Sequence, residues 1–318
     1  MRVAVLDLGS NSFHLVVVDV DASGGFVRVC RQKHMLGLGA VVARHGAIPP
    51  PHADRAIRTF RSLLAQARVT GADVVLACAT AAIRQAANGG ALVAAMEAGT
   101  GVTIRILSGD DEARLVFGAV VASVPLGDEP VLCLDVGGGS LEVVVGTRHG
   151  PDFVASAELG AARLCAELVH HDPPSGRERA AVTERIRTSF RPLVVAAGHL
   201  RPTMAVATGG VVRDLARLAA ARRTDSVRFL DRLRVSLGDL RRIEAELYDL
   251  PAERRARLQG IEPARALVAP VGASMLASAL DQWGMDGLVI ARWGLREGVL
   301  LEHLAGRRSG DDHPSLVA

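Results

Sequence analysis

Lysine is nearly absent from this chain of 318 residues. Lys33, between Gln32 and His34, is the single lysine among 37 basic side chains. A Walker A loop requires a lysine between glycine and serine or threonine, so this nucleotide-binding motif is excluded. A Schiff-base mechanism would depend on the same residue.

Cysteine is also scarce, and its spacing excludes two kinds of chemistry. The four cysteines form no Cys-x-x-Cys pair. Structural zinc sites and thioredoxin-type redox motifs require such pairs. We therefore expect reduced thiols that pack in the core. They are Cys30, Cys78, Cys133 and Cys165.

Long apolar runs and a strong net charge are lacking too. No run of 18 apolar residues occurs, and the N-terminal segment reaches Asp7 after four apolar residues, which predicts neither a signal peptide nor a membrane span. The net charge is +3, too small to bind nucleic acid through the overall field. We expect a cytoplasmic protein without nucleic-acid or membrane partners, so a polyanion site would have to be local.

One pattern occurs twice. Residues 3–6 are typical of a buried strand, 7–12 of a turn and 13–20 of a second strand, and the pattern returns 128 residues later at 131–145. Because a strand and not a helix follows each turn, Rossmann and P-loop units are disfavoured. The length favours two domains. We predict similar domains whose matching loops face one another across a cleft.

The remaining periodicity is typical of an α/β protein. Domains are predicted over 1–122 and 123–305, with the last helix packing back on the first domain and a disordered tail over 306–318. Strands are expected at 74–79, 102–107 and 204–207. Helices are expected at 53–67, 90–98, 110–121, 177–197, 211–221, 236–248, 264–283 and 293–305.

Acidic residues follow the first strand of each repeat. Asp7 precedes a turn of small residues, where a carboxylate beside main-chain amides suits a hard cation and phosphate, although it could equally start an ordinary turn. Asp135 precedes three glycines, 137–139, which would weaken a plain hairpin and favour close approach of a ligand. Glu142 on the outgoing strand either reaches the cation, directly or through water, or is an ordinary strand-face acid.

Three further places are candidates for chemistry. The acids at 110–112 suit the start of a helix without any function, but one of them, Glu112, is the candidate general base. Arg84 either clamps a phosphate or bridges two surface segments. Gly209 and Gly210 could present amides to a phosphate or a nucleoside at the start of a helix.

Seven arginines between residues 212 and 234 form a local basic stretch. Either a solvated helix face or a docking strip for an extended polyanion explains it. The residues are Arg213, Arg217, Arg222, Arg223, Arg228, Arg232 and Arg234.

Five segments in order match the signatures of one family, at residues 7–15, 79–88, 135–142, 208–210 and 293–300. The sequence resembles the exopolyphosphatase / guanosine pentaphosphate phosphohydrolase family, within the acetate and sugar kinase, Hsp70 and actin superfamily. This resemblance implies an α/β fold of two duplicated actin-like (ribonuclease H-like) domains. Each would be a mixed sheet flanked by helices, with the active site in the cleft between them.

The resemblance also implies site residues. Glu112 aligns with the catalytic base, and Asp135 and Glu142 align with magnesium-associated carboxylates. We expect Asp7 to join them at a Mg²⁺ ion, with Mn²⁺ as the other candidate. The expected phosphate-binding residues are Gly9, Ser10, Asn11, Ser12, Arg84, Gly137, Gly138, Gly139, Ser140, Gly209 and Gly210.

The chain departs from the family pattern at three positions. Asp111 stands where a glutamate is usual, Leu141 where threonine is common, and Leu267 where an aspartate is usual. The chain also ends before the additional C-terminal helical region of the long members. The resemblance therefore implies a short two-domain form that is less processive or prefers short chains.

These observations predict a Mg²⁺-dependent exopolyphosphatase that releases the terminal phosphate of inorganic polyphosphate. One alternative is hydrolysis of the 5′-γ-phosphate of guanosine pentaphosphate, and another is an ATP-dependent kinase of the same superfamily. A third is a non-catalytic sensor that binds guanosine tetraphosphate or polyphosphate. The resemblance makes a homodimer plausible.

Overall fold

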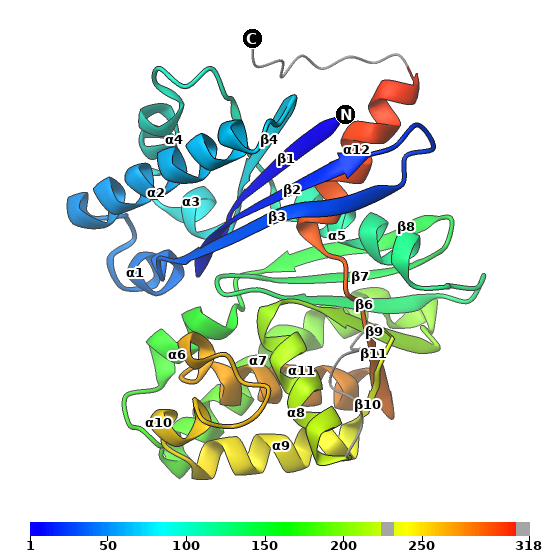
Figure 1. Cartoon of the computed structure of the whole chain (residues 1–318). Coiled ribbons are helices and arrows are strands. Elements are labelled where there is room, and N and C mark those ends of the chain that lie inside the picture. Colours follow the sequence, from blue (N-terminus) through cyan, green and yellow to red (C-terminus); the bar gives the residue numbers. More distant parts are fainter. Residues whose placement is uncertain (224–231, 310–318) are drawn as a thin grey trace. The chain divides into compact units, whose positions relative to one another are not determined.

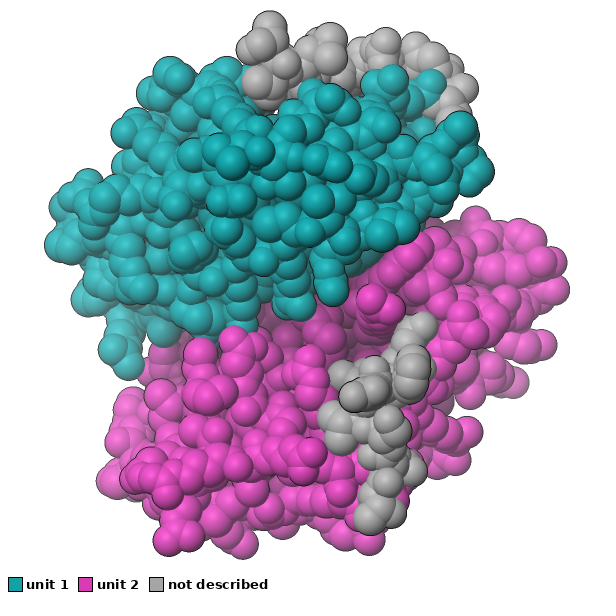
Figure 2. Space-filling model, in the orientation of Figure 1, with its two compact units in different colours: residues 1–115, 295–318 teal, residues 116–294 magenta. Residues whose placement is uncertain are grey.

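The computed structural model describes residues 1–223 and 232–309 (Figure 1). Contacts divide the chain into two compact units, unit 1 with residues 1–115 and 295–318, and unit 2 with residues 116–294 (Figure 2). This division falls inside helix α5 (Gly109–Ser123), a few residues before the expected boundary at 122/123. Among the described residues, no helix is both long and apolar enough to cross a membrane.

Unit 1 is a five-stranded mixed sheet in the order β3-β2-β1-β4-β5. The β1–β2 and β2–β3 pairs are antiparallel, and the β1–β4 and β4–β5 pairs are parallel. The strands are β1 (Arg2–Leu8), β2 (Ser12–Val20), β3 (Phe26–Met35), β4 (Val74–Ala79) and β5 (Ile104–Ile106). The helices are α1 (Leu38–His45), α2 (Pro50–Val69), α3 (Ala81–Gln85), α4 (Gly89–Glu97), the start of α5, and α12 (Leu295–Ser309).

Both faces of this sheet are covered, which explains why β1 is a continuous apolar run. Phe60 and Leu63 of α2 pack on one face with Leu6. Val299 of α12 packs on the other face with Val5. The C-terminal helix therefore belongs to the core of unit 1.

Unit 2 is a six-stranded mixed sheet in the order β10-β11-β9-β6-β7-β8. Its strands are β6 (Val131–Val136), β7 (Leu141–Thr147), β8 (Gly150–Ala157), β9 (Met204–Thr208), β10 (Arg234–Ser236) and β11 (Gly287–Ile290). Its helices are α6 (Ala161–Leu168), α7 (Gly176–Ala197), α8 (Gly210–Arg222), α9 (Leu237–Asp249), α10 (Ala252–Arg255) and α11 (Ala269–Trp283), with 3₁₀ turns at Gly198–Leu200 and Pro263–Arg265.

The two sheets repeat one topology. The series β8-β7-β6-β9-β11 has the same order and the same strand directions as β3-β2-β1-β4-β5. The register also matches, because Asp7 lies opposite His14 in unit 1 and Asp135 lies opposite Glu142 in unit 2. The predicted α/β class with a duplicated mixed sheet is confirmed.

Some elements differ from the prediction. The helix expected over 264–283 is a 3₁₀ turn followed by α11, because Pro270 sits in the first turn of the helix, where its missing N–H costs nothing. Helix α12 continues to Ser309, four residues into the expected disordered tail, and residues 310–318 lie outside the described residues. The sequence analysis did not anticipate β3, α1, β8, α6, β10 or β11.

Candidate functional site

The first loop, residues 9–12, joins β1 to β2 in unit 1. The main-chain amides of Leu36, Gly37 and Gly39, between the end of β3 and the start of α1, donate to the carbonyls of Ser10 and Asn11 at 2.7–3.0 Å. In a trans peptide the carbonyl and the following N–H point in opposite directions. The amides of Asn11 and Ser12 therefore point away from this turn, as an anion cradle requires.

The second loop, residues 137–140, is held in the same way in unit 2. The amides of residues 161–163, at the start of α6, donate to the carbonyls of Gly137 and Gly138 at 3.0 Å. By the same geometry, the amides of Gly138 and Gly139 point away from α6. A Cβ atom on Gly160 would lie 2.3 Å from the main chain of Gly138, so this close approach requires glycine.

The two supporting segments were missed by the sequence analysis. Both carry Leu-Gly just before a helix, at residues 36–37 and 159–160. This second repeat is the signal that could have found them.

Glu112 is the one acid of its cluster that turns inward. Asp110 is exposed and the Asp111 side chain is 47% exposed, whereas that of Glu112 is only 8% exposed. Nη1 of Arg84 lies 2.9 Å from Oε2 of Glu112 and also donates to the carbonyl of Leu107. A favourable macrodipole alone would not bury this side chain against an arginine.

The first loop lies beside this ion pair within unit 1. The amide of Ala82, two residues before Arg84, donates to the buried Oγ of Ser10 at 3.0 Å. Burial raises the pKa of the Cys78 thiol well above its usual range, and the nearby charges of Asp7 and Glu112 raise it further. Asp7, Ser10, Arg84 and Glu112 thus occupy one region of unit 1.

His14 adds a contact that the sequence analysis did not single out. Its Nε2 lies 2.8 Å from the Oγ of Ser12, and its strand partner on β1 is Asp7. The serine hydroxyl of the first loop is therefore oriented by a neighbouring imidazole.

In unit 2, Asp135 and Glu142 form a cross-strand pair. Glu142 is 1% exposed, and its Oε1 accepts a hydrogen bond of 2.9 Å from the Oγ of Ser156. Burial, followed by the charges of Asp135 and Glu142, raises the pKa of the Cys133 thiol. Two carboxylates thus meet at the base of the second loop.

In the part of the chain that the structure describes, few carboxylates are close enough together to hold a divalent cation. Among the described residues, no three or more His, Cys, Asp or Glu side chains gather to hold a metal ion. Mg²⁺ commonly uses one or two carboxylates and completes its shell with water and substrate phosphate. The pair Asp135 and Glu142 fits such a site, and the metal role of Asp7 stays a prediction.

Gly209 lies against the end of β6, just before the second loop, whereas Gly210 lies against the side chain of Arg265. Gly209 has φ of 120°, and a Cβ there would lie 2.5 Å from the carbonyl oxygen of Val136 and 3.2 Å from Oδ1 of Asp135. Gly210 begins α8. The turn after β9 is therefore packed tightly beside Asp135, a position only glycine can take.

The arginine stretch over 212–234 is largely neutralised. Within the described residues, Arg217 pairs with Asp214 at 3.0 Å and Arg234 with Asp286 at 2.8 Å. Arg222 pairs with Glu246 and Arg223 with Asp239; Arg228 lies outside the described residues. These ion pairs favour a solvated, structural face over a polyanion strip.

The structure thus groups the predicted site residues into two sets, each assembled within its own unit. Their role in one common cleft stays a prediction. The set in unit 1 is Asp7, Gly9, Ser10, Asn11, Ser12, Arg84 and Glu112. The set in unit 2 is Asp135, Gly137, Gly138, Gly139, Ser140, Glu142, Gly209 and Gly210.

Comparison with known proteins tests the resemblance. A model of the Ppx/GppA phosphatase family matches residues 16–306. The chain belongs to this family. Exopolyphosphatase 1 of Mycobacterium tuberculosis is 33% identical over 311 residues, which cover 98% of this chain and 90% of that protein. Exopolyphosphatase 1 of Mycobacterium leprae is 32% identical over 313 residues, with 98% and 91% covered.

Solved structures of similar proteins have the same fold as this chain. The crystal structure of an exopolyphosphatase from Cytophaga hutchinsonii has a TM-score of 0.89 and 25% identity, covering 98% of this chain and 99% of that chain. A Ppx/GppA family member from Aquifex aeolicus has a TM-score of 0.80 and 24% identity, covering 96% and 98%.

The three departures from the family pattern differ in setting. Asp111 faces solvent and lies 3.9 Å from Arg105, so the shorter acid leaves Glu112 in place. Leu141 is fully buried in the apolar core of unit 2. Leu267 is 57% exposed, and its main-chain carbonyl accepts from Arg255.

Proposed function

We propose that this protein is an exopolyphosphatase, which hydrolyses the terminal phosphoanhydride bond of inorganic polyphosphate. The observation that carries the proposal is the pair of loops whose carbonyls are bound at a helix start, so that their amides turn outward. The names of the relatives support the substrate. The net charge of +3 is small, so a polyanionic substrate would be bound by local groups such as Arg84 and the loop amides.

Glu112 acts as the general base. Its carboxylate takes a proton from the attacking water, the water oxygen bonds to the terminal phosphorus, and the bond from that phosphorus to the bridging oxygen breaks. The departing phosphate chain keeps the electron pair. Arg84 holds Glu112 through Nη1, and the donors on Nε and Nη2 serve a phosphate oxygen.

Main-chain amides stabilise the charge that develops on the phosphoryl oxygens. The first loop supplies Asn11 and Ser12, and the second loop supplies Gly138 and Gly139. Because these amides are fixed before substrate arrives, little reorganisation is needed during reaction.

Asp135 and Glu142 are the residues that would hold Mg²⁺, with Asp7 as the corresponding carboxylate of unit 1. The ion supplies positive charge that offsets the phosphate oxygens. Mn²⁺ accepts the same oxygen ligands, so both ions belong in the test.

The experiment is a phosphate-release assay with purified protein. Long and short polyphosphate chains, guanosine pentaphosphate and ATP are each supplied with Mg²⁺, with Mn²⁺ and with a chelator. We expect release from polyphosphate that requires a divalent ion. Release from guanosine pentaphosphate alone would favour the alternative hydrolase. Tight binding without release would indicate a sensor, and ADP formation that depends on an acceptor would indicate a kinase.

A further inference from the structure

One face of the unit 1 sheet changes from apolar to charged along its strands. Side chains on alternate residues share a face, and directly opposed residues on neighbouring strands lie side by side. Helix α12 packs through Val299 and Leu300 on the apolar part of this face, which is made by Val3, Val5, Val16 and Val18.

The next row on the same face is Asp7, His14 and Lys33. Asp7 lies opposite His14, and His14 lies opposite Lys33. All three side chains are half-buried. The valine stripe thus gives way to ionisable residues at the end of the face that lies beside the first loop, where a charged substrate would be held.

Lys33 lies within reach of the first loop. Adjacent strands are spaced at about 4.8 Å, so the Cα of Lys33 is roughly 10 Å from that of Asp7. Arg31 lies two residues earlier on the same face, opposite Val16. The cationic end of the row is therefore beside the loop that would hold the terminal phosphate.

The equivalent row of unit 2 carries two acids and no lysine or arginine. There Asp135 lies opposite Glu142, and Glu142 lies opposite Ser156. The two sheets share their topology and register, so the fold itself does not require a cation at the position of Lys33. An anionic row suits a metal ion, whereas a row that ends in lysine suits an anion.

We propose that Lys33, with Arg31 behind it, forms a subsite for the phosphates that follow the terminal one in the substrate chain. This inference rests on the proposed function and adds the residues that select for chain length. Lysine suits such a subsite because its ammonium is a point charge on a flexible stem, which can follow a shifting row of phosphates.

The test compares the wild type with Lys33→Met, which keeps the apolar stem and removes the charge. Steady-state kinetics are measured on tripolyphosphate and on long-chain polyphosphate. We expect the KM for long chains to rise about tenfold, as for the loss of one charged hydrogen bond, with kcat little changed. The KM for tripolyphosphate should change less, and Lys33→Arg should recover most of the loss.

Arg58→Met is the matched control. Arg58 is an exposed residue of α2, the helix that packs on the other face of the same sheet. The variant removes one positive charge from the same unit, so a loss caused only by net charge would appear in both variants. We expect Arg58→Met to keep the wild-type KM.

Binding of long-chain polyphosphate under chelation is measured in parallel, together with the thermal midpoint of each variant. If the wild type binds polyphosphate and Lys33→Met binds equally well, the subsite is wrong while the proposed function stands. If Lys33→Met lowers only the thermal midpoint, the lysine is structural and the subsite is again wrong. A wild type that neither binds nor hydrolyses polyphosphate overturns the proposed function itself.

Discussion

Unit 1 and unit 2 each place a loop after the first strand of the repeated sheet. Main-chain amides near a helix start bind the carbonyls of both loops, but the other contacts of the two loops differ. The first loop uses side chains, since Ser10 accepts from the amide of Ala82 and Ser12 contacts His14. The second loop relies on glycine, since Gly160 packs directly against its main chain and Gly209 packs against Val136, the residue just before the loop. With the same topology, side-chain hydrogen bonds support the loop of unit 1, and close packing of glycine main chain supports the loop of unit 2.

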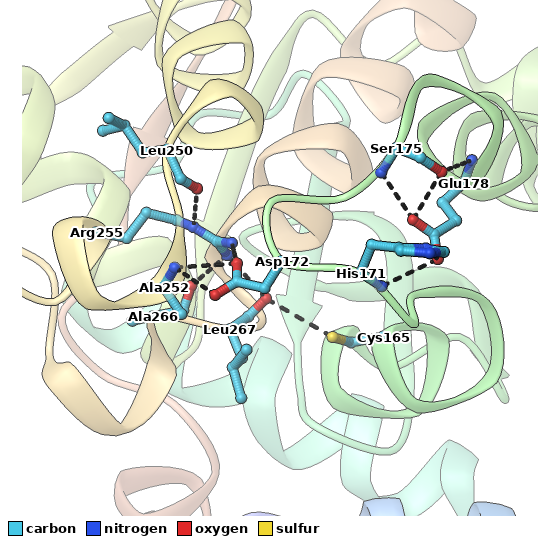
Figure 3. A network of polar contacts seen from close by, with 10 residues as sticks. All are labelled: Cys165, His171, Asp172, Ser175, Glu178, Leu250, Ala252, Arg255, Ala266 and Leu267. Atoms are coloured by element: carbon cyan, nitrogen blue, oxygen red, sulfur yellow. Dashed lines mark hydrogen bonds and ion pairs between the residues drawn. The ribbon is translucent and has the colours of Figure 1, made fainter.

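A buried ion pair of unit 1 and a polar network of unit 2 also differ in their surroundings. In unit 1 the buried ion pair is Arg84 with Glu112, beside the loop. In unit 2 a polar network around Asp172, Glu178 and Arg255 ties chain segments together (Figure 3). We infer that the Arg84–Glu112 pair serves the proposed chemistry, whereas this network of unit 2 stabilises the fold.

The largest effect is expected from Arg255→Met. The Arg255 side chain is 1% exposed, is ion-paired with Asp172 and donates to the carbonyls of Leu250 and Ala266 at 2.8 and 2.7 Å. Its loss leaves these acceptors without their donor, which should cost about 3–5 kcal/mol of unfolding free energy. Denaturant unfolding of the variant and the wild type measures this difference in unfolding free energy. Arg254→Met, at an exposed neighbour, is the control, and equal midpoints for the two variants would contradict the structural role.

Glu112→Gln should lower kcat by about 10² or more, because glutamine cannot accept the proton from water. The KM should change little, since the amide keeps the shape of the side chain. Asp111→Asn is the control on the solvent side of the same helix turn, and it should retain wild-type turnover. Near-normal kcat in Glu112→Gln would remove Glu112 as the base.

A pair of glycine variants compares the two loop supports. In Gly160→Ala the new methyl group would lie 2.3 Å from the main chain of Gly138, so the second loop must shift, at about 1–3 kcal/mol. In Gly37→Ala the Cβ meets nothing within 4 Å, and only the φ of 67° is unfavourable, at about 1 kcal/mol. Unfolding curves and KM values should show the larger change in Gly160→Ala. Equal effects would mean that the tight approach of α6 is unimportant.

The smallest effect concerns acid stability. The hydrogen bond from the His171 side chain, together with those from Ser175 and the amide of His170, lowers the pKa of Glu178 below its usual 4.5. The folded state therefore prefers the carboxylate, so its stabilising contribution is present above pH 4.5 and is lost as the pH falls below it. The thermal midpoint of Glu178→Gln should lie below that of the wild type at neutral pH, and the gap should narrow in acid. A gap independent of pH would contradict this.

The repeat could be predicted from the sequence because each copy is formed by residues that are close together in the chain. A buried strand, a turn of small residues and a second strand follow directly along the chain at residues 3–20 and 131–145. Glu112 could be named as a candidate, but the three acids of its cluster look alike in sequence. Only the structure shows that it alone turns inward to Arg84, 28 positions away in the chain.

The sequence by itself determined the α/β class, the duplicated hairpins and the residue types of both loops, because strand periodicity and turn chemistry act over a few residues. Tertiary structure decided which groups meet: Arg84 with Glu112, the start of α6 with the second loop, and Lys33 in one row with Asp7. These meetings depend on strand register and on packing between segments distant in the chain, where a shift of one residue would move each side chain to the opposite face.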